Sequence, residues 1–362
     1  MRNRIVDRPL LVVPYGIATP CDLTKQAPAI PLAACRADNA EKNPGGHMPK
    51  HIRALYGAAW LFIAVMLLVD CIWALRIGFR LDRGSVVQTL VLVAGIAAIS
   101  GLLRGIARVP YKNAGRARFY QNVFTIFMWI TALIVFTKVC IVFQYLGVTT
   151  NHPLATHTFI AIDSAFGFHW LDTYRWVQAH PWLHTALAIA YTSGAWQLFA
   201  IPIILAVTRN AEDYAEFVVQ FMVSATLVIL IAMPFPAESA YVHFGIHDRD
   251  TASTVSDFAL FRDGHAHALN LALVQGLVSF PSLHTILALC FAYTLRHVRI
   301  VFPLAVALNA LMIVSTLTQG GHYLADVLSG LVAGALVIWV VRRVVVRAAQ
   351  PLDHPVASVL AP

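Results

Sequence analysis

The sequence predicts an all-α fold, a polytopic bundle of transmembrane helices, and three observations support this prediction. Hydrophobic residues make up 59% of the 362 residues and charged residues only 12%, whereas ordinary globular chains have roughly 45–50% and 25%. Several apolar runs reach the length of about 20 residues that a helix needs to cross a bilayer. These runs show no alternation with a period of two, which favours helices over an outer-membrane barrel.

The composition of residues 1–50 predicts a disordered N-terminal tail. It carries seven Pro and seven Lys or Arg and shows no sustained hydrophobic periodicity, so it lacks the apolar surface that a folded segment buries. Met48 stands just before the first apolar run and is an alternative start of the chain.

Hydropathy predicts about eight membrane spans after this tail. The expected spans are residues 55–75, 86–103, 119–146, 183–207, 215–234, 281–296, 299–317 and 324–344.

The distribution of Lys and Arg predicts the orientation. The connection 104–118 holds five of them, so the positive-inside rule places it in the cytoplasm. The long connections 147–182 and 235–280 hold only one and two, and we expect both to face outwards. The segment with Arg76, Arg80 and Arg83 disagrees with this assignment. The pattern as a whole favours a bacterial inner membrane with these two long loops in the periplasm.

The stretch 158–182 mixes aromatic side chains with Asp and His. Helical spacing of aromatic residues beside polar ones predicts a helix that lies in the membrane interface. Simple anchoring by a belt of Trp side chains is the alternative interpretation.

Two outward-facing segments carry the residues suited to chemistry. Phe280–His284 begins the sixth expected span, and Ser315–Asp326 joins the seventh to the eighth. Ionisable residues at a membrane boundary are costly and are therefore functional candidates. Two His and one Asp come from these segments on the same predicted side.

The spacing within these segments predicts a nucleophilic His. His322 and Asp326 are four residues apart, so on a helix they share a face. The carboxylate can then accept a hydrogen bond from one imidazole nitrogen and leave the other as nucleophile or base. Gly320 and Gly321 let the backbone approach a ligand closely. Pro281 suits the first turn of a helix, which places His284 near a helix N-terminus, where a phosphate can bind.

Other interpretations of the same residues remain open. A His at a membrane interface can be purely structural, or the His pair can serve as a proton relay in a membrane transporter. Two His and an Asp can also bind zinc, but no Cys or further carboxylate joins these loops, so we expect no metal. The basic residues form no patch interleaved with aromatic residues, and we expect no nucleic acid partner.

These motifs resemble the type-2 phosphatidic acid phosphatase superfamily, which carries Lys-x6-Arg-Pro, then Pro-Ser-x-His, then Ser-Arg-x5-His-x3-Asp. The second element matches at residues 281–284, and the third matches at Ser315, His322 and Asp326, with Thr316 in place of the Arg. The first element is absent. With this element absent and with Phe-Pro-Ser-x-His and Gly-His-Tyr-x-x-Asp present, the sequence looks more like the inositol phosphorylceramide synthase (aureobasidin-target) branch.

The resemblance implies a six-helix core, which we place in a catalytic membrane domain over residues 119–345. Residues 51–118 would then form two accessory helices and a basic cytoplasmic loop, and 346–362 a cytoplasmic tail.

The resemblance also implies roles for individual residues. His322 would attack phosphorus and form a phosphohistidine, Asp326 would orient His322, and His284 would protonate the leaving oxygen. Ser282, Ser315 and Gly321 would contact phosphate oxygens. The family uses no metal and no cofactor.

The missing first element removes the cations that usually stabilise a transferring phosphoryl group. Arg262 on the same outer loop is the first candidate replacement, and an ion pair with Asp263 is its alternative role. Lys138 in the third span is the second candidate, because an intramembrane Lys is rare. Its alternative role is snorkelling to the interface.

The predicted function is therefore that of a membrane phosphatase or phosphotransferase, a hydrolase or transferase of phospholipid metabolism. Its substrate would be a lipid phosphate or phosphodiester. Water as acceptor gives a phosphatase, and a lipid or polyol alcohol gives a head-group transferase. The sequence leaves the acceptor open.

Overall fold

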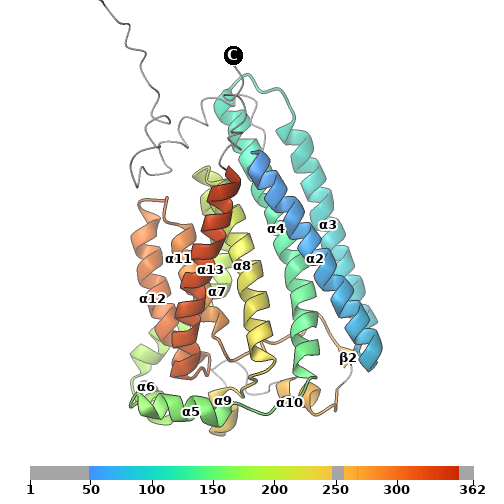
Figure 1. Cartoon of the computed structure of the whole chain (residues 1–362). Coiled ribbons are helices and arrows are strands. Elements are labelled where there is room, and N and C mark those ends of the chain that lie inside the picture. The colour runs from blue at the N-terminus through green and yellow to red at the C-terminus, as the bar shows by residue number, and fades with distance from the viewer. Residues whose placement is uncertain (1–48, 247–256, 267, 350–362) are drawn as a thin grey trace, which may run out of the picture. The chain divides into compact units, whose positions relative to one another are not determined.

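The computed structural model describes residues 49–246, 257–266 and 268–349 (Figure 1). The expected tail 1–50 lies outside these ranges apart from its last two residues, and so does the C-terminal tail beyond residue 349. The helices are α2 (Lys50–Ile77), α3 (Arg83–Ala107), α4 (Ala114–Val148), α5 (Thr156–Ala165), α6 (Trp170–Gln178), α7 (Pro181–Val207), α8 (Ala211–Ala232), α9 (Ala240–His243), α10 (Asp257–Arg262), α11 (Leu283–Thr294), α12 (Val301–Gln319) and α13 (Leu324–Ala349). Two-residue strands, β1 (Arg80–Leu81) and β2 (Ala268–Leu269), pair in parallel.

Within the described residues, seven helices are long and apolar enough to cross a membrane, namely α2, α3, α4, α7, α8, α12 and α13. They correspond to seven of the eight expected spans, and the all-α polytopic fold is confirmed. The expected span 281–296 instead forms α11, which has 12 residues. At 1.5 Å per residue this helix is about 18 Å long, shorter than the roughly 30 Å core of a bilayer.

The short helix α11 lies inside the bundle and contacts α7, α8, α12 and α13. Its Phe291 and Cys290 are completely buried. A helix that is buried on all sides is apolar whether or not it crosses a membrane, so hydropathy alone does not set its length. The cap at Ser282 begins the helix, and the chain turns at Leu295 before Arg296.

The two N-terminal helices pack on α4, and α4 in turn packs on α8. Helix α3 buries only Ser85 completely, and most of its other side chains are exposed. The largest core cluster lies between α4, α8 and α11, where Trp129, Phe136, Phe217 and Phe291 are almost fully buried.

The expected interface helix over residues 158–182 forms two short helices, α5 and α6, which lie across one end of the bundle with α9 and α10 (Figure 1). The break falls at Gly167, whose φ of +71° is in the left-handed region that favours glycine.

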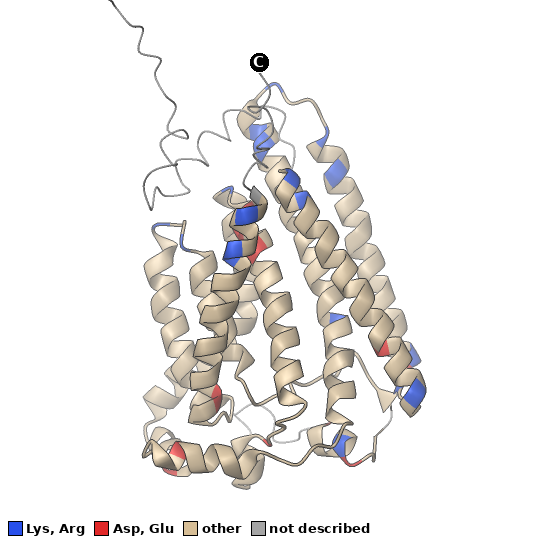
Figure 2. Cartoon of the chain, viewed as in Figure 1, with Lys and Arg blue, Asp and Glu red and all other residues tan. Residues whose placement is uncertain are grey.

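Basic residues gather at the opposite end, where α2 begins and α13 ends (Figure 2). There Arg296 bridges two buried carboxylates of α8, with its Nη2 atom 3.1 Å from Asp213 and 2.7 Å from Glu216. His297 lies 2.9 Å from Asp213. This network fixes the turn between α11 and α12 to α8.

Candidate active site

The candidate site centres on His322 and Asp326, at the end of the bundle that α5 and α6 cover. His322 lies in the turn between α12 and α13, and Asp326 lies in the first turn of α13. Nδ1 of His322 is 3.2 Å from Oδ2 of Asp326, and both side chains are almost fully buried. Because a carboxylate only accepts hydrogen bonds, we assign the proton to Nδ1, which leaves a lone pair on Nε2.

Two further donors fix the Asp326 carboxylate. The hydroxyl of Ser279 donates to Oδ2 at 2.7 Å, and the backbone N–H of Tyr323 donates to the same oxygen at 3.0 Å. No local sequence pattern predicts this role for Ser279, because it lies 47 residues from Asp326 along the chain.

The turn that carries His322 is held by main-chain hydrogen bonds and by a close approach at Gly321. The N–H groups of Gly320 and His322 both donate to the Thr316 carbonyl. Gly321 has φ +63°, and a Cβ atom there would lie 2.7 Å from Cδ2 of Tyr241. Its carbonyl accepts a hydrogen bond from the N–H of Ala240 at 2.9 Å. Only glycine fits this position, as the close approach of the segment 239–241 requires.

The second His comes from the start of α11. Ser282 caps this helix, since its hydroxyl oxygen accepts from the N–H of Thr285 at 3.4 Å. The N–H of Ser282 donates to the Asp326 carbonyl at 3.0 Å, which joins the two motif segments. As a result the ring centroids of His284 and His322 are 6.3 Å apart. Tyr191 of α7 stacks on His284, with 4.7 Å between centroids.

The covering helices also hold the site. Asp163 of α5 is buried, and its two carboxylate oxygens accept from the N–H groups of Leu324 and Ala325 at 2.9 and 2.8 Å. Trp170 of α6 donates from its ring N–H to the Leu317 carbonyl at 2.8 Å. The unpaired N–H groups at the start of α13 are thus capped by a residue from a distant helix.

Burial raises the pKa of Asp163 above its ordinary value, and the Asp326 carboxylate raises it further, while the two backbone hydrogen bonds oppose the shift.

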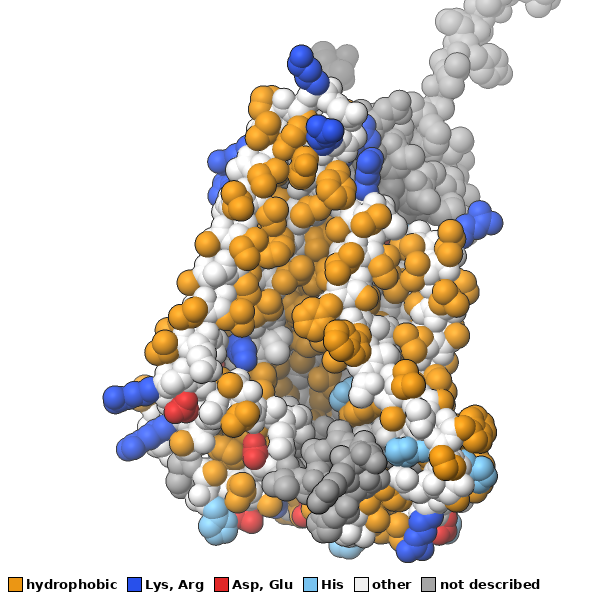
Figure 3. Space-filling view, turned by 180° about the vertical axis from the view of Figure 1, so that it is seen from behind, with side chains coloured by type: hydrophobic (Ala, Val, Ile, Leu, Met, Phe, Trp, Pro, Cys, Tyr) orange, Lys and Arg blue, Asp and Glu red, His pale blue; other side chains and the backbone are white. Residues whose placement is uncertain are grey.

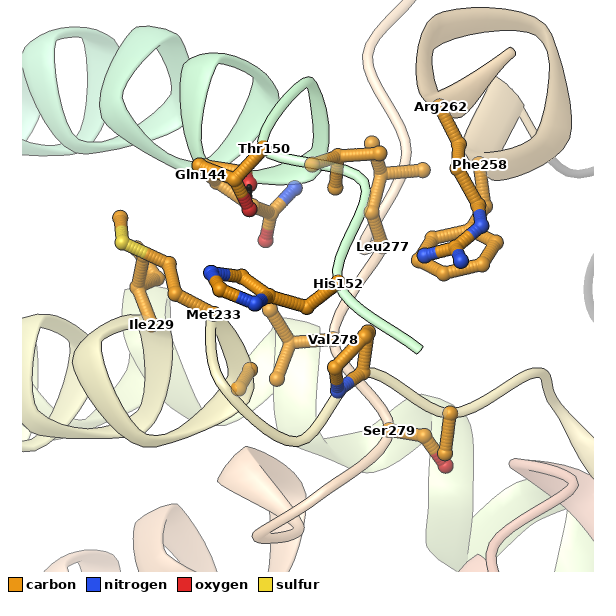
Figure 4. A pocket seen from close by; sticks show the side chains of 15 residues that line it. Gln144, Thr150, His152, Ile229, Met233, Phe258, Arg262, Leu277, Val278 and Ser279 are labelled. Atoms are coloured by element: carbon orange, nitrogen blue, oxygen red, sulfur yellow. Dashed lines mark hydrogen bonds between the residues drawn. The ribbon is translucent and has the colours of Figure 1, made fainter. Parts of the chain in front are cut away.

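The other predicted site residues differ in burial and in hydrogen-bond partners. Ser282 and Ser315 are fully buried, and the Ser315 hydroxyl donates to the Met312 carbonyl at 2.6 Å. Lys138 donates to the Leu271 carbonyl at 2.9 Å. Arg262 ends α10 and lines a pocket that Ser279 also lines (Figure 4). Within the described residues Arg262 forms no ion pair with Asp263.

Sequence reasoning did not single out Ser279, Asp163, Tyr191 or Tyr241 as functional residues. Each acts through a contact between distant segments, which no local spacing reveals.

The part of the chain that the structure describes contains no group of three or more His, Cys, Asp or Glu side chains placed to hold a metal ion. The imidazole of His284 lies next to the His322–Asp326 pair.

Comparison with known proteins identifies the family of this chain. The model of the PAP2 superfamily matches residues 157–340, which is just over half of the chain and spans α5 to most of α13. A search of curated proteins and a search of solved structures found no match. Because the matched region holds both His segments and Asp326, the chain belongs to the PAP2 superfamily.

Proposed function

We propose that the protein is an integral membrane enzyme that hydrolyses or transfers the phosphoryl group of a lipid phosphate or phosphodiester through a phosphohistidine at His322. Membership of the PAP2 superfamily supports phosphatase-type activity on a lipid phosphate in general. The observation that carries the finer proposal is that His322 pairs with Asp326 while its ring centroid lies 6.3 Å from that of His284.

In the first step, the Nε2 lone pair of His322 attacks phosphorus, and the bond from phosphorus to the leaving oxygen breaks. His284 gives a proton to that oxygen, so that the lipid product leaves as an alcohol. The Asp326 carboxylate stabilises the positive charge that develops on the His322 ring. In the second step, His284 takes a proton from water or an acceptor alcohol, whose oxygen attacks phosphorus and breaks the phosphorus–nitrogen bond.

Phosphate oxygens need hydrogen-bond donors during both steps. Ser282 is the better placed of the two predicted serines. Its oxygen accepts in the helix cap, so the hydroxyl hydrogen is still available for donation. The hydroxyl hydrogen of Ser315 is engaged by the Met312 carbonyl. Gly321 and Lys138 complete the proposed set of residues around the reacting phosphate, whereas Arg262, the other candidate cation, lines a separate pocket.

The surface of the bundle suits a lipid substrate. Hydrophobic side chains cover the face in Figure 3 and line a hollow between the α2–α4 side and the α7–α12 side. Helix α8, otherwise largely buried, exposes Val223 and Leu230. An acyl chain in such a hollow would stay in an apolar environment while its head group reaches the end of the bundle where the His pair lies.

The head-group acceptor defines the finer function. Transfer to an alcohol, as in the inositol phosphorylceramide synthase branch, is the version that the missing Lys-x6-Arg-Pro element favours. Such transfer requires that the acceptor reach phosphorus before water does. The proposed orientation places the site on the periplasmic face of a bacterial inner membrane.

The test follows the phosphorus atom. Purified protein in neutral detergent with EDTA receives phosphorus-labelled phospholipids, with and without alcohol acceptors. Free phosphate indicates a phosphatase, and a new labelled lipid that requires the acceptor indicates a transferase. Either activity should disappear in His322→Ala and persist in His169→Ala, a change of an exposed His at the start of α6. No transfer of label from any lipid would contradict the proposal and favour the proton-relay transporter.

A further inference from the structure

A pocket lies between the ends of α4 and α8, next to the His322–Asp326 pair (Figure 4). Gln144 of α4 and Met233 after α8 form two of its walls, and α10 and the segment 277–279 form the others. It is partly open, and its roughly 370 Å³ of empty space includes open solvent.

The ionisable side chains that line this pocket are both basic. Arg262 extends from α10 alongside the Phe258 ring, with its guanidinium carbon 5.9 Å from the ring centroid, and His152 projects into the middle (Figure 4). No Asp or Glu is among the lining residues. Within the described residues, neither the Arg262 side chain nor the His152 side chain has a hydrogen-bonding or ion-pair partner. Among the residues that the structure describes, no carboxylate therefore neutralises the Arg262 charge.

The chemistry of the lining fits a phosphate on an apolar stem. A guanidinium binds phosphate through two parallel hydrogen bonds, and the Gln144 and Thr150 side chains add polar atoms. Ile229, Met233 and Leu277 form an apolar wall. Because α4 and α8 end at this level, the pocket lies where lipid head groups lie, and a guanidinium there can form charge-assisted hydrogen bonds to an anionic head group.

The pocket is not the place where His322 attacks. Ser279 lines the pocket and donates to Asp326, which faces Nδ1 of His322. The two nitrogens of an imidazole point to different sides of the ring, so Nε2 is directed away from Asp326 and Ser279. A phosphate beside Arg262 would thus be bound on the opposite side of the pair from the attacking atom.

We propose that this pocket is a second phosphate site, in which Arg262 and His152 hold the head group of an anionic lipid that does not react. The inference rests on the proposed function only in taking a lipid as the carrier of the phosphate. In this site Arg262 binds a lipid head group instead of replacing the cations of the missing Lys-x6-Arg-Pro element.

The test is photo-crosslinking in full-length His322→Ala protein in neutral detergent, which requires no turnover. One probe is phosphatidic acid with a diazirine close to the head group, and the other is a diacylglycerol with the same diazirine. We expect phosphatidic acid to label the segments 144–152, 229–237 and 277–279 at least about tenfold more than diacylglycerol, since only the former offers a charge-assisted hydrogen bond to Arg262.

Variants test the two basic side chains separately. Arg262→Gln and His152→Gln should each reduce this labelling, the first by about tenfold, whereas Arg175→Gln, an exposed Arg of α6 at the same end, should not. If millimolar inorganic phosphate reduces labelling by phosphatidic acid, the site binds phosphate and also accepts the free ion. Equal labelling by diacylglycerol, labelling confined to residues 316–323, or unchanged labelling in Arg262→Gln would overturn it. If the pocket is labelled as expected but the wild type turns over no lipid, the proposed function is contradicted and the second phosphate site is not.

Discussion

The hydroxyl of Ser279 donates a 2.7 Å hydrogen bond to the same Asp326 oxygen that faces Nδ1 of His322. Ser279 is buried, so this bond is shielded from water. It connects the segment before α11 to the turn that carries His322, and it orients the carboxylate that contacts the His322 imidazole.

Ser279→Ala should lower kcat with little change in KM. Loss of a buried hydrogen bond to a charged group costs about 1.5–3 kcal/mol, which corresponds to roughly 10- to 150-fold if the loss falls on the transition state. The measurement is steady-state kinetics with the labelled lipid that the wild type turns over. Ser279→Thr keeps the hydroxyl and should recover most of the rate. A purely structural role would instead lower the thermal stability of both variants without a selective effect on kcat.

Gly321→Ala should destabilise the protein and abolish most activity. The residue has φ +63°, and its new Cβ would approach Tyr241 to 2.7 Å. The conformational cost alone is about 1–2 kcal/mol, before the clash with the ring. Thermal unfolding in detergent gives the change in stability.

Gly57→Ala is the matched control for this substitution. Gly57 lies inside α2, and a Cβ there would meet no atom within 4 Å. The change should raise stability by up to about 1 kcal/mol. Equal stability of the two Ala variants would contradict the close packing at Gly321.

Asp163→Asn should weaken the docking of α5 on the start of α13. The two carboxylate oxygens accept from two N–H groups, whereas an amide has one acceptor oxygen. One buried N–H then lacks a partner, at a cost of about 1–3 kcal/mol. The expected result is a lower Tm together with a lower kcat, because Leu324 and Ala325 adjoin the turn that carries His322, the proposed nucleophile. Asp172→Asn, an exposed Asp of α6, should leave both quantities unchanged.

The same residue predicts a pH dependence of stability. Because the pKa of Asp163 is raised in the folded protein, the folded state holds this proton more tightly than the unfolded chain does. The stabilisation is complete below about pH 4, the ordinary pKa of Asp, and is lost as the pH rises through the raised value. Tm measured across this window should therefore fall more steeply with pH in the wild type than in Asp163→Asn. Parallel curves would contradict the assignment.

Arg296→Met should unfold the bundle more readily without acting on the chemistry. The substitution leaves the buried negative charges of Asp213 and Glu216 without their Arg296 partner. Breaking a buried ion pair costs about 3–5 kcal/mol of folding stability. Arg299→Met removes an exposed cation one turn away and should change stability by less than about 0.5 kcal/mol. The comparison of the two Tm values measures the contribution of the network. Protein that remains folded should keep its activity.

Local patterns predict much of this molecule, and contacts between distant segments account for the rest. Apolar runs predict the seven long helices because lipid requires them, and the four-residue spacing of His322 and Asp326 predicts their contact. Hydropathy did not predict the short length of α11, since a helix enclosed by protein is as apolar as one in lipid.

Asp163 shows a second limit of local patterns. It lies among the aromatic residues of an expected interface helix, and its partner Leu324 is 161 residues away. A carboxylate that caps a remote helix and one that faces water look alike in a sequence.

The hydrogen bond from the Ser282 N–H to the Asp326 carbonyl consists of main-chain atoms alone. Its length does not depend on which side chains the two residues carry, so the spacing between the two His segments is set by the backbone. Substitutions in these segments can therefore change the selectivity of the site while its frame persists. Insertion of one residue between Pro281 and His284 would rotate the imidazole by about 100° around α11, and no side-chain replacement could restore it.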